Sequence, residues 1–188
     1  MKKQLIYGMI LLLFSTAALA HSGHALSNAY AGFIHPFMGM DHLLMMLAVG
    51  VWAAKLSGDI RWKLPVAFVI FMAVGASLGF IGFSFSGVET VVASTVIVMG
   101  VLLAINLPLS TKISVSVVAV FAAFHGLAHG LELNGSQNHS ALLGMFVATA
   151  ILHGIGFMVG LQREQVKHWI NAGLAFSMMV VGSLFLVY

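Results

Sequence analysis

Long apolar stretches separated by short polar segments make up most of this chain. From residue 33 onward, six such stretches of about 20 residues can be marked off, which is the length that an α-helix needs to cross about 30 Å of hydrocarbon. They cover residues 33–54, 64–85, 88–107, 113–131, 141–161 and 169–187. The pattern predicts an all-α, polytopic membrane protein with six transmembrane helices. The connections are short, so consecutive helices should be antiparallel neighbours.

The first twenty residues have a different pattern. A basic start at Lys2 and Lys3 precedes an apolar run over 5–14 and a small-residue end, Ala18-Leu19-Ala20. This order is typical of a signal peptide, and the apolar run is too short to span a bilayer. We expect residues 1–20 to be a cleaved signal peptide and 21–188 to form one six-helix transmembrane domain. A short uncleaved first helix is the alternative.

Basic residues are distributed unevenly over the predicted connections. Cleavage would place the mature amino terminus outside, so the connections at 55–63, 108–112 and 162–168 would lie in the cytoplasm. All the basic residues of the mature chain fall in or beside these three connections: Lys55, Arg61, Lys63, Lys112, Arg163 and Lys167. This agrees with the positive-inside rule. The sequence therefore predicts a multi-pass protein of the bacterial inner membrane with both mature termini periplasmic.

Composition excludes several classes of protein. Apolar residues make up 61% of the chain and charged residues only 7%, whereas soluble domains carry about 25% charged residues. No polar stretch is long enough for a separate soluble domain, so lipid is the expected surrounding. The chain has no cysteine, which excludes thiolate metal sites and iron–sulfur clusters. The pI near 9.5 does not indicate a nucleic-acid partner, because there is no basic patch with interleaved aromatic residues.

Ionisable residues lie inside two of the predicted spans, where each costs a few kcal/mol on insertion scales and is a functional hypothesis by default. The first span holds His35, Asp41 and His42, and the fourth holds His125, His129 and Glu132. At about 100° per residue, the three in the fourth span form one stripe.

The first span is less regular. His35 and His42 would share a helix face, but Pro36 disfavours the α conformation at His35, which would then cap the helix. Asp41 is expected either to bind metal itself or to orient a ligand histidine by accepting its N–H.

Helix direction places both groups in the outer half of the membrane, where they can meet. Imidazole and carboxylate without thiolate suit borderline divalent ions such as nickel, cobalt, zinc or copper. Weaker candidates are Glu89, His153, His21 and His24. For these the plainer alternatives are a solvated interfacial carboxylate at Glu89, a hydrogen bond between helices at His153, and a flexible polar tail at His21 and His24. Four methionines near the first group would supply soft ligands, although methionine in a membrane helix more often packs: Met38, Met40, Met45 and Met46.

Two longer motifs contain these residues: H-P-x-x-G-x-D-H at 35–42 and F-H-G-x-A-H-G-x-E at 124–132. With them, the whole chain resembles the HupE/UreJ family of nickel and cobalt permeases. The resemblance implies secondary import of Ni²⁺ or Co²⁺ as the transported substrate, in support of hydrogenase or urease maturation. It also implies that His35, Asp41, His42, His125, His129 and Glu132 are metal ligands or their orienting partners. The 35–42 motif has one more residue between histidine and aspartate than the H-x4-D-H signature of the broader nickel/cobalt transporter class.

These features favour a transporter over an enzyme, with no prosthetic group and no nucleotide-binding motif. One alternative is a membrane-embedded metal-dependent hydrolase, which the missing H-E-x-x-H motif disfavours. Another is a cytochrome with paired histidines as haem ligands. The sequence leaves the oligomeric state open, a homo-oligomer included.

Overall fold

The computed structural model describes residues 28–134 and 139–187, and every regular element within these ranges is helical. The bounds are α2 Ala29–Met38, α3 Met40–Ala54, η2 Gly58–Trp62, α4 Lys63–Phe80, α5 Val88–Ile105, α6 Thr111–Leu133, α7 His139–Gly160 and α8 Glu164–Val187. The all-α prediction is confirmed. The predicted signal peptide, His21 and His24 lie outside the described residues.

The six predicted spans are recovered, with corrections to their shape and ends. Five helices are long and apolar enough to cross a membrane, and α2 and α3, which are bent by 83° relative to each other, pass the same test when they are taken together as one span. The first span is therefore not one straight helix. The second ends at Phe80 instead of residue 85, and the sixth begins at Glu164 instead of residue 169. Glu164 lies in the first turn of α8, where the helix dipole favours a carboxylate, and its Oε1 lies 3.3 Å from Lys167 Nζ.

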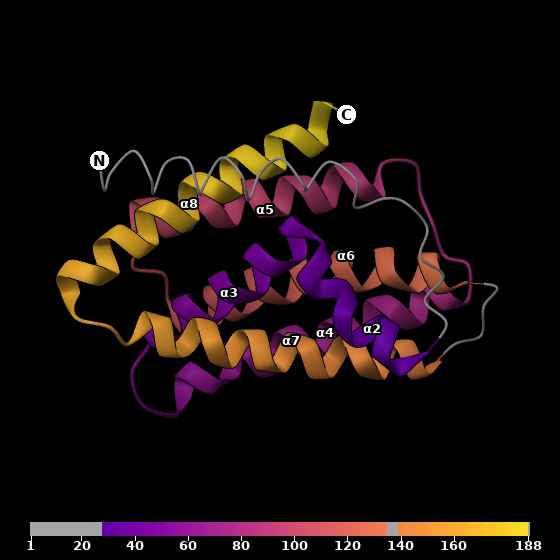
Figure 1. Ribbon diagram of the computed structural model, residues 1–188, viewed down its shortest axis with the longest axis horizontal. Helices are drawn as coiled ribbons and strands as arrows, with labels where there is room; N and C mark the ends of the chain where they lie inside the picture. Colours follow the sequence, from indigo (N-terminus) through magenta and orange to yellow (C-terminus); the bar gives the residue numbers. More distant parts are fainter. Residues whose placement is uncertain (1–27, 135–138, 188) are drawn as a thin grey trace.

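The most extensive contacts join helices that are not consecutive, with α3 in the middle (Figure 1). The prediction that consecutive helices are the main antiparallel neighbours is therefore wrong: α4 and α6 run parallel, as do α3 and α7, and only α5 and α8 among the large pairs are antiparallel. The helix α4 packs along α6, α5 along α8, and α7 along both α2 and α3. Because α3 also contacts α4, α5 and α8, it is the helix around which the bundle is assembled. This position carries the second half of the 35–42 motif into the interior.

Glycine allows the closest of these contacts. A Cβ on Gly75 of α4 would meet the Ala123 carbonyl, and a Cβ on Gly126 of α6 would meet the Met72 carbonyl. The two backbones therefore touch reciprocally, as small residues permit in membrane helices. Gly82, by contrast, follows α4 with a left-handed φ of 82° and so ends the helix.

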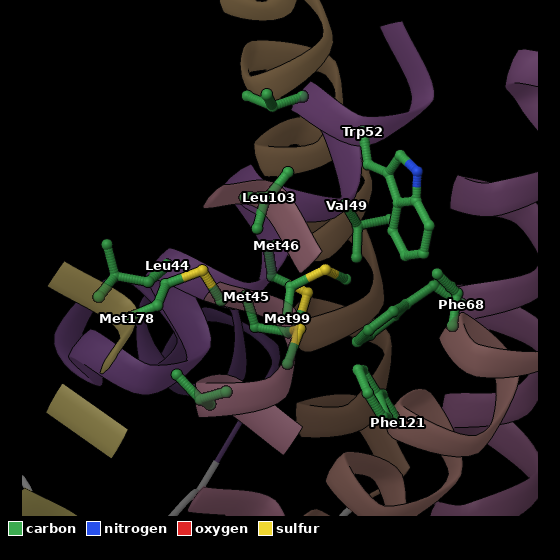
Figure 2. Close-up of a cluster of buried hydrophobic side chains, with 14 of the residues drawn as sticks. Leu44, Met45, Met46, Val49, Trp52, Phe68, Met99, Leu103, Phe121 and Met178 are labelled. Atoms are coloured by element: carbon green, nitrogen blue, oxygen red, sulfur yellow. The ribbon is translucent and has the colours of Figure 1, made fainter. Parts of the chain in front are cut away.

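Methionine and aromatic side chains fill the centre of the bundle. Figure 2 shows Met45 and Met46 of α3 with Met99, Met178 and Phe68 in one buried cluster. Met45 and Met46 are at most 1% exposed. Their flexible thioethers suit irregular interior space, so the structure favours packing over metal binding for these two residues.

The basic connections gather at one end of the bundle. Lys55, which follows α3, donates a 2.8 Å hydrogen bond from Nζ to Asn106 Oδ1, beyond the end of α5. Burial lowers the pKa of Lys55, and the nearby charge of Lys167 at the start of α8 lowers it further. The ends of α3 and α5 and the start of α8 therefore lie together, as expected when successive spans alternate in direction. That this end is cytoplasmic stays a prediction.

Candidate metal centre

The bend between α2 and α3 brings His35 close to His42. In a straight helix, seven residues would separate them by about 10.5 Å along the axis. In the structure their ring centroids are 5.6 Å apart. Contrary to the expectation from Pro36, His35 lies within α2, and the helix breaks at Gly39. It is the bend that makes the two histidines neighbours.

Gly39 is the one residue between the two helices, and its backbone is extended (φ −88°, ψ 117°). A Cβ at this position would lie 2.9 Å from Asp41 Oδ1 and 2.9 Å from His42 Nδ1. This φ and ψ are open to any residue, so sterics and not backbone strain explain the glycine. Its lack of a side chain leaves room for the Asp41–His42 pair.

The helix α6 completes a cluster with His129. The ring centroid of His129 lies 5.1 Å from that of His35 and 4.6 Å from that of His42. One nitrogen from each of the three rings can be chosen so that all lie within 4.8 Å of one another. We call His35, His42 and His129 the three-histidine centre. The convergence expected from helix direction is therefore present.

Asp41 contacts His42 directly. The Nδ1 of His42 lies 2.9 Å from Asp41 Oδ1, so the N–H donates to the carboxylate. In a neutral imidazole this leaves Nε2 as a lone-pair acceptor, and Nε2 is buried without a hydrogen-bond partner among the described residues. Of the two roles expected for Asp41, the geometry favours orienting His42.

Glu132 lies at the exposed side of the centre, one turn beyond His129. Its Oε2 is 3.6 Å from His35 Nε2 and 3.7 Å from His129 Nδ1, which is too far for a hydrogen bond. Its side chain is 45% exposed. A partly solvated carboxylate beside two imidazoles is well placed to attract a cation and to join its ligands.

His125 lies one step deeper than the centre. Its Nδ1 donates to the Phe121 carbonyl at 3.0 Å, and a carbonyl can only accept, so a neutral ring keeps its Nε2 free of a proton. That Nε2 is buried and unpartnered among the described residues. The ring centroid is 5.5 Å from that of His42. His125 is thus a neighbour of the centre and not part of the three-nitrogen cluster.

The weaker candidates are not gathered into the cluster. Glu89 is exposed in the first turn of α5, and His153 is buried on α7. Sequence reasoning gave no role to Phe68 of α4, whose ring lies 6.1 Å from that of His125 and 5.1 Å from that of His153. An apolar residue in an apolar span carries no signal that could have identified it.

The spacing in the three-histidine centre suits one metal ion after a small contraction. Imidazole nitrogens about 2.0–2.1 Å from a tetrahedral ion lie about 3.4 Å apart, against the 4.8 Å limit found here. Rotation of side chains can supply such a change. A set of imidazoles with nearby carboxylates favours borderline divalent ions.

Comparison with known proteins gives two matches. A family model described as "HupE / UreJ protein" matches residues 9–185. A relative, Protein HupE of Rhizobium leguminosarum bv. viciae, is 44% identical over 140 residues, which cover 74% of this chain and 73% of that protein. No solved structure matches the chain.

Proposed function

Because the chain belongs to the HupE/UreJ family, we propose that it is a secondary transporter that imports Ni²⁺, and also Co²⁺, across the bacterial inner membrane. The observation that carries the proposal is the three-histidine centre, within 4.8 Å, formed by residues of membrane-spanning helices. Ionisable side chains in such helices cost free energy of insertion, so their presence there indicates a function. In support of hydrogenase or urease maturation, the imported ion would pass to the cytoplasm.

A transported ion must be released as well as bound, and the centre is suited to both. Structural metal sites usually close four protein ligands around the ion. Here three imidazoles are brought together, and Glu132 stands within 4 Å of two of them without a hydrogen bond. An ion held by three imidazoles can exchange Glu132 for water. This lability favours transport over permanent retention.

Uptake of radiolabelled nickel into proteoliposomes tests the proposal. Vesicles containing the wild-type protein should accumulate nickel faster than protein-free vesicles, and excess cobalt should compete. Excess zinc tests how selective the centre is. If the wild type moves none of the three ions in either orientation, the transport proposal is wrong, and the metal-dependent hydrolase predicted as the alternative becomes the one to examine.

Replacing Asp41 by asparagine should weaken nickel uptake through its effect on His42. An amide at this position can donate to Nδ1 and so favour the tautomer whose Nε2 carries the proton. Loss of such an orienting carboxylate typically costs about 10–100-fold in metal affinity. We expect the KM for nickel to rise by that order, measured by uptake at varied nickel concentration. Asp59→Asn, at an exposed carboxylate of η2, is the control, and equal KM values for both variants would contradict the assigned role.

A further inference from the structure

Histidines account for more than half of the buried polar atoms without partners in the described part of the protein. Among the described residues, seven buried side-chain nitrogen or oxygen atoms lack a hydrogen-bond partner, and four of them belong to His42, His125 and His153. A polar atom left unsatisfied away from water destabilises the folded state. Repetition of this cost on three histidines indicates that their nitrogens are kept free for a ligand.

The three rings follow one another from the three-histidine centre into the inner half of the bundle. The ring of His42 lies 5.5 Å from that of His125, and the ring of Phe68 neighbours those of both His125, at 6.1 Å, and His153, at 5.1 Å. Three helices, α3, α6 and α7, supply the histidines, and α4 supplies Phe68. The series ends at His153, beyond the middle of α7.

No hydrogen bond among the described residues explains why a histidine is buried at position 153. It is 2% exposed, and neither Nδ1 nor Nε2 has a hydrogen-bond partner within the described part of the chain. The alternative expected from the sequence, a hydrogen bond between helices, is therefore not made. A leucine would fill the same space against Phe68 without a polar atom to desolvate.

A cavity lies beside His153 and extends along α7 from Ala150 to Phe157. It has a volume of about 360 Å³ and lies between α4 and α7, which is room for several waters. His153 lines it, as do Trp62 and Phe157. These two rings stack at 5.0 Å, and Arg61 lies over Phe157 at 5.9 Å. Trp62 directly precedes α4, at the end where the basic connections gather.

The side of this cavity that faces outward from the bundle is apolar. Val66 and Ile70 of α4 line it and are about half exposed, so acyl chains would cover them in a bilayer. The only ionisable side chain among its described lining residues is His153. It is therefore the one described lining residue able to bind a cation in this cavity.

We propose that His153 is an inner binding station for the transported divalent cation, which takes the ion after His125 and releases it into the α4–α7 cavity. The assignment rests on the proposed transport function. One imidazole holds the ion, and water in the cavity completes its coordination. A single protein ligand binds weakly, which suits a station that must pass the ion on.

Transport kinetics of His153→Leu test the station. Its Vmax for nickel uptake should fall at least about tenfold, while KM, set at the three-histidine centre, should stay within about twofold. Thr149→Val, one turn earlier on α7 and equally buried, is the matched control and should keep the wild-type Vmax. His153→Gln should show the same loss if the leucine variant does not fold. A wild-type Vmax in either folded His153 variant would overturn the proposal.

Nickel binding to purified protein in detergent separates this proposal from the transport proposal. A His42→Ala/His129→Ala variant should retain one weak nickel site by equilibrium dialysis, and adding His153→Leu should abolish it. Retention of that site in the triple variant would overturn the inner station even if uptake is confirmed. If the wild type does not transport nickel, the proposed transport function is wrong. If the weak nickel site is nevertheless lost with His153→Leu, the assignment of a binding site to His153 is still supported.

Discussion

Replacing His129 by alanine should reduce nickel uptake by at least about 100-fold, or about 2.7 kcal/mol of lost stabilisation of the transported ion. His129 is the only α6 member of the three-histidine centre, and it is 3% exposed. Its removal leaves the centre with His35 and His42 from the bent first span. Initial uptake rates in proteoliposomes, divided by the amount of protein reconstituted, measure the effect.

His168→Ala is the matched control for this loss. His168 is an exposed histidine of α8 whose ring contacts Trp169, far along the chain from both motifs. It should transport at the wild-type rate. His42→Ala should fail like His129→Ala, because both imidazoles belong to the same cluster. Uptake within about twofold of wild type in either centre variant would mean that the three-histidine centre does not carry the ion, since a lost ligand costs far more.

Replacing Gly126 by valine should greatly lower the amount of folded protein. A Cβ at Gly126 would collide with the backbone carbonyl of Met72 on α4, and a backbone cannot rotate away as a side chain can. Overpacking of an interior typically costs about 1–3 kcal/mol and sometimes more. We expect the high end here, because α4 and α6 form the most extensive helix pair of the bundle. Yield after detergent extraction and the thermal unfolding midpoint measure it.

The matched control is Gly173→Ala on α8. A Cβ there has nothing within 4 Å, so alanine should leave stability unchanged or raise it by up to about 1 kcal/mol through helix propensity. Normal yield and an unchanged midpoint for Gly126→Val would show that α4 and α6 do not pack as described. Reduced yield for both variants would show a general intolerance of side chains at helical glycines instead.

Much of the fold could be predicted because lipid restricts the choices so strongly. Backbone groups must be satisfied within each segment in hydrocarbon, so a stretch of about 20 apolar residues allows only a helix. Helix ends were less predictable. Residue 85 was expected to belong to the second span, but the positive φ of Gly82 ends that helix earlier, and hydropathy does not report a backbone angle.

For the candidate site too, one part could be predicted from the sequence and another part could not. Six residues could be identified as a group because ionisable side chains are so unusual in apolar spans, and helix direction brought them to one depth. The sequence could not separate them by role. That His42, and not His125, joins His35 and His129 within 4.8 Å depends on how α3 and α6 are rotated against each other, which no periodicity within one helix determines.

The helical class and the approximate spans were thus predictable from residue order alone, as were the candidate site residues, since these follow from local composition and the demands of the bilayer. Tertiary structure decided the rest: the 83° bend at Gly39, the pairing of Asp41 with His42, and the line of rings that leads through Phe68 to His153. Each of these depends on distances between residues that are far apart in sequence or on a turn of the backbone. Such distances arise only when glycine-lined helices pack against one another, because close backbone contact fixes both the rotation and the depth of each helix.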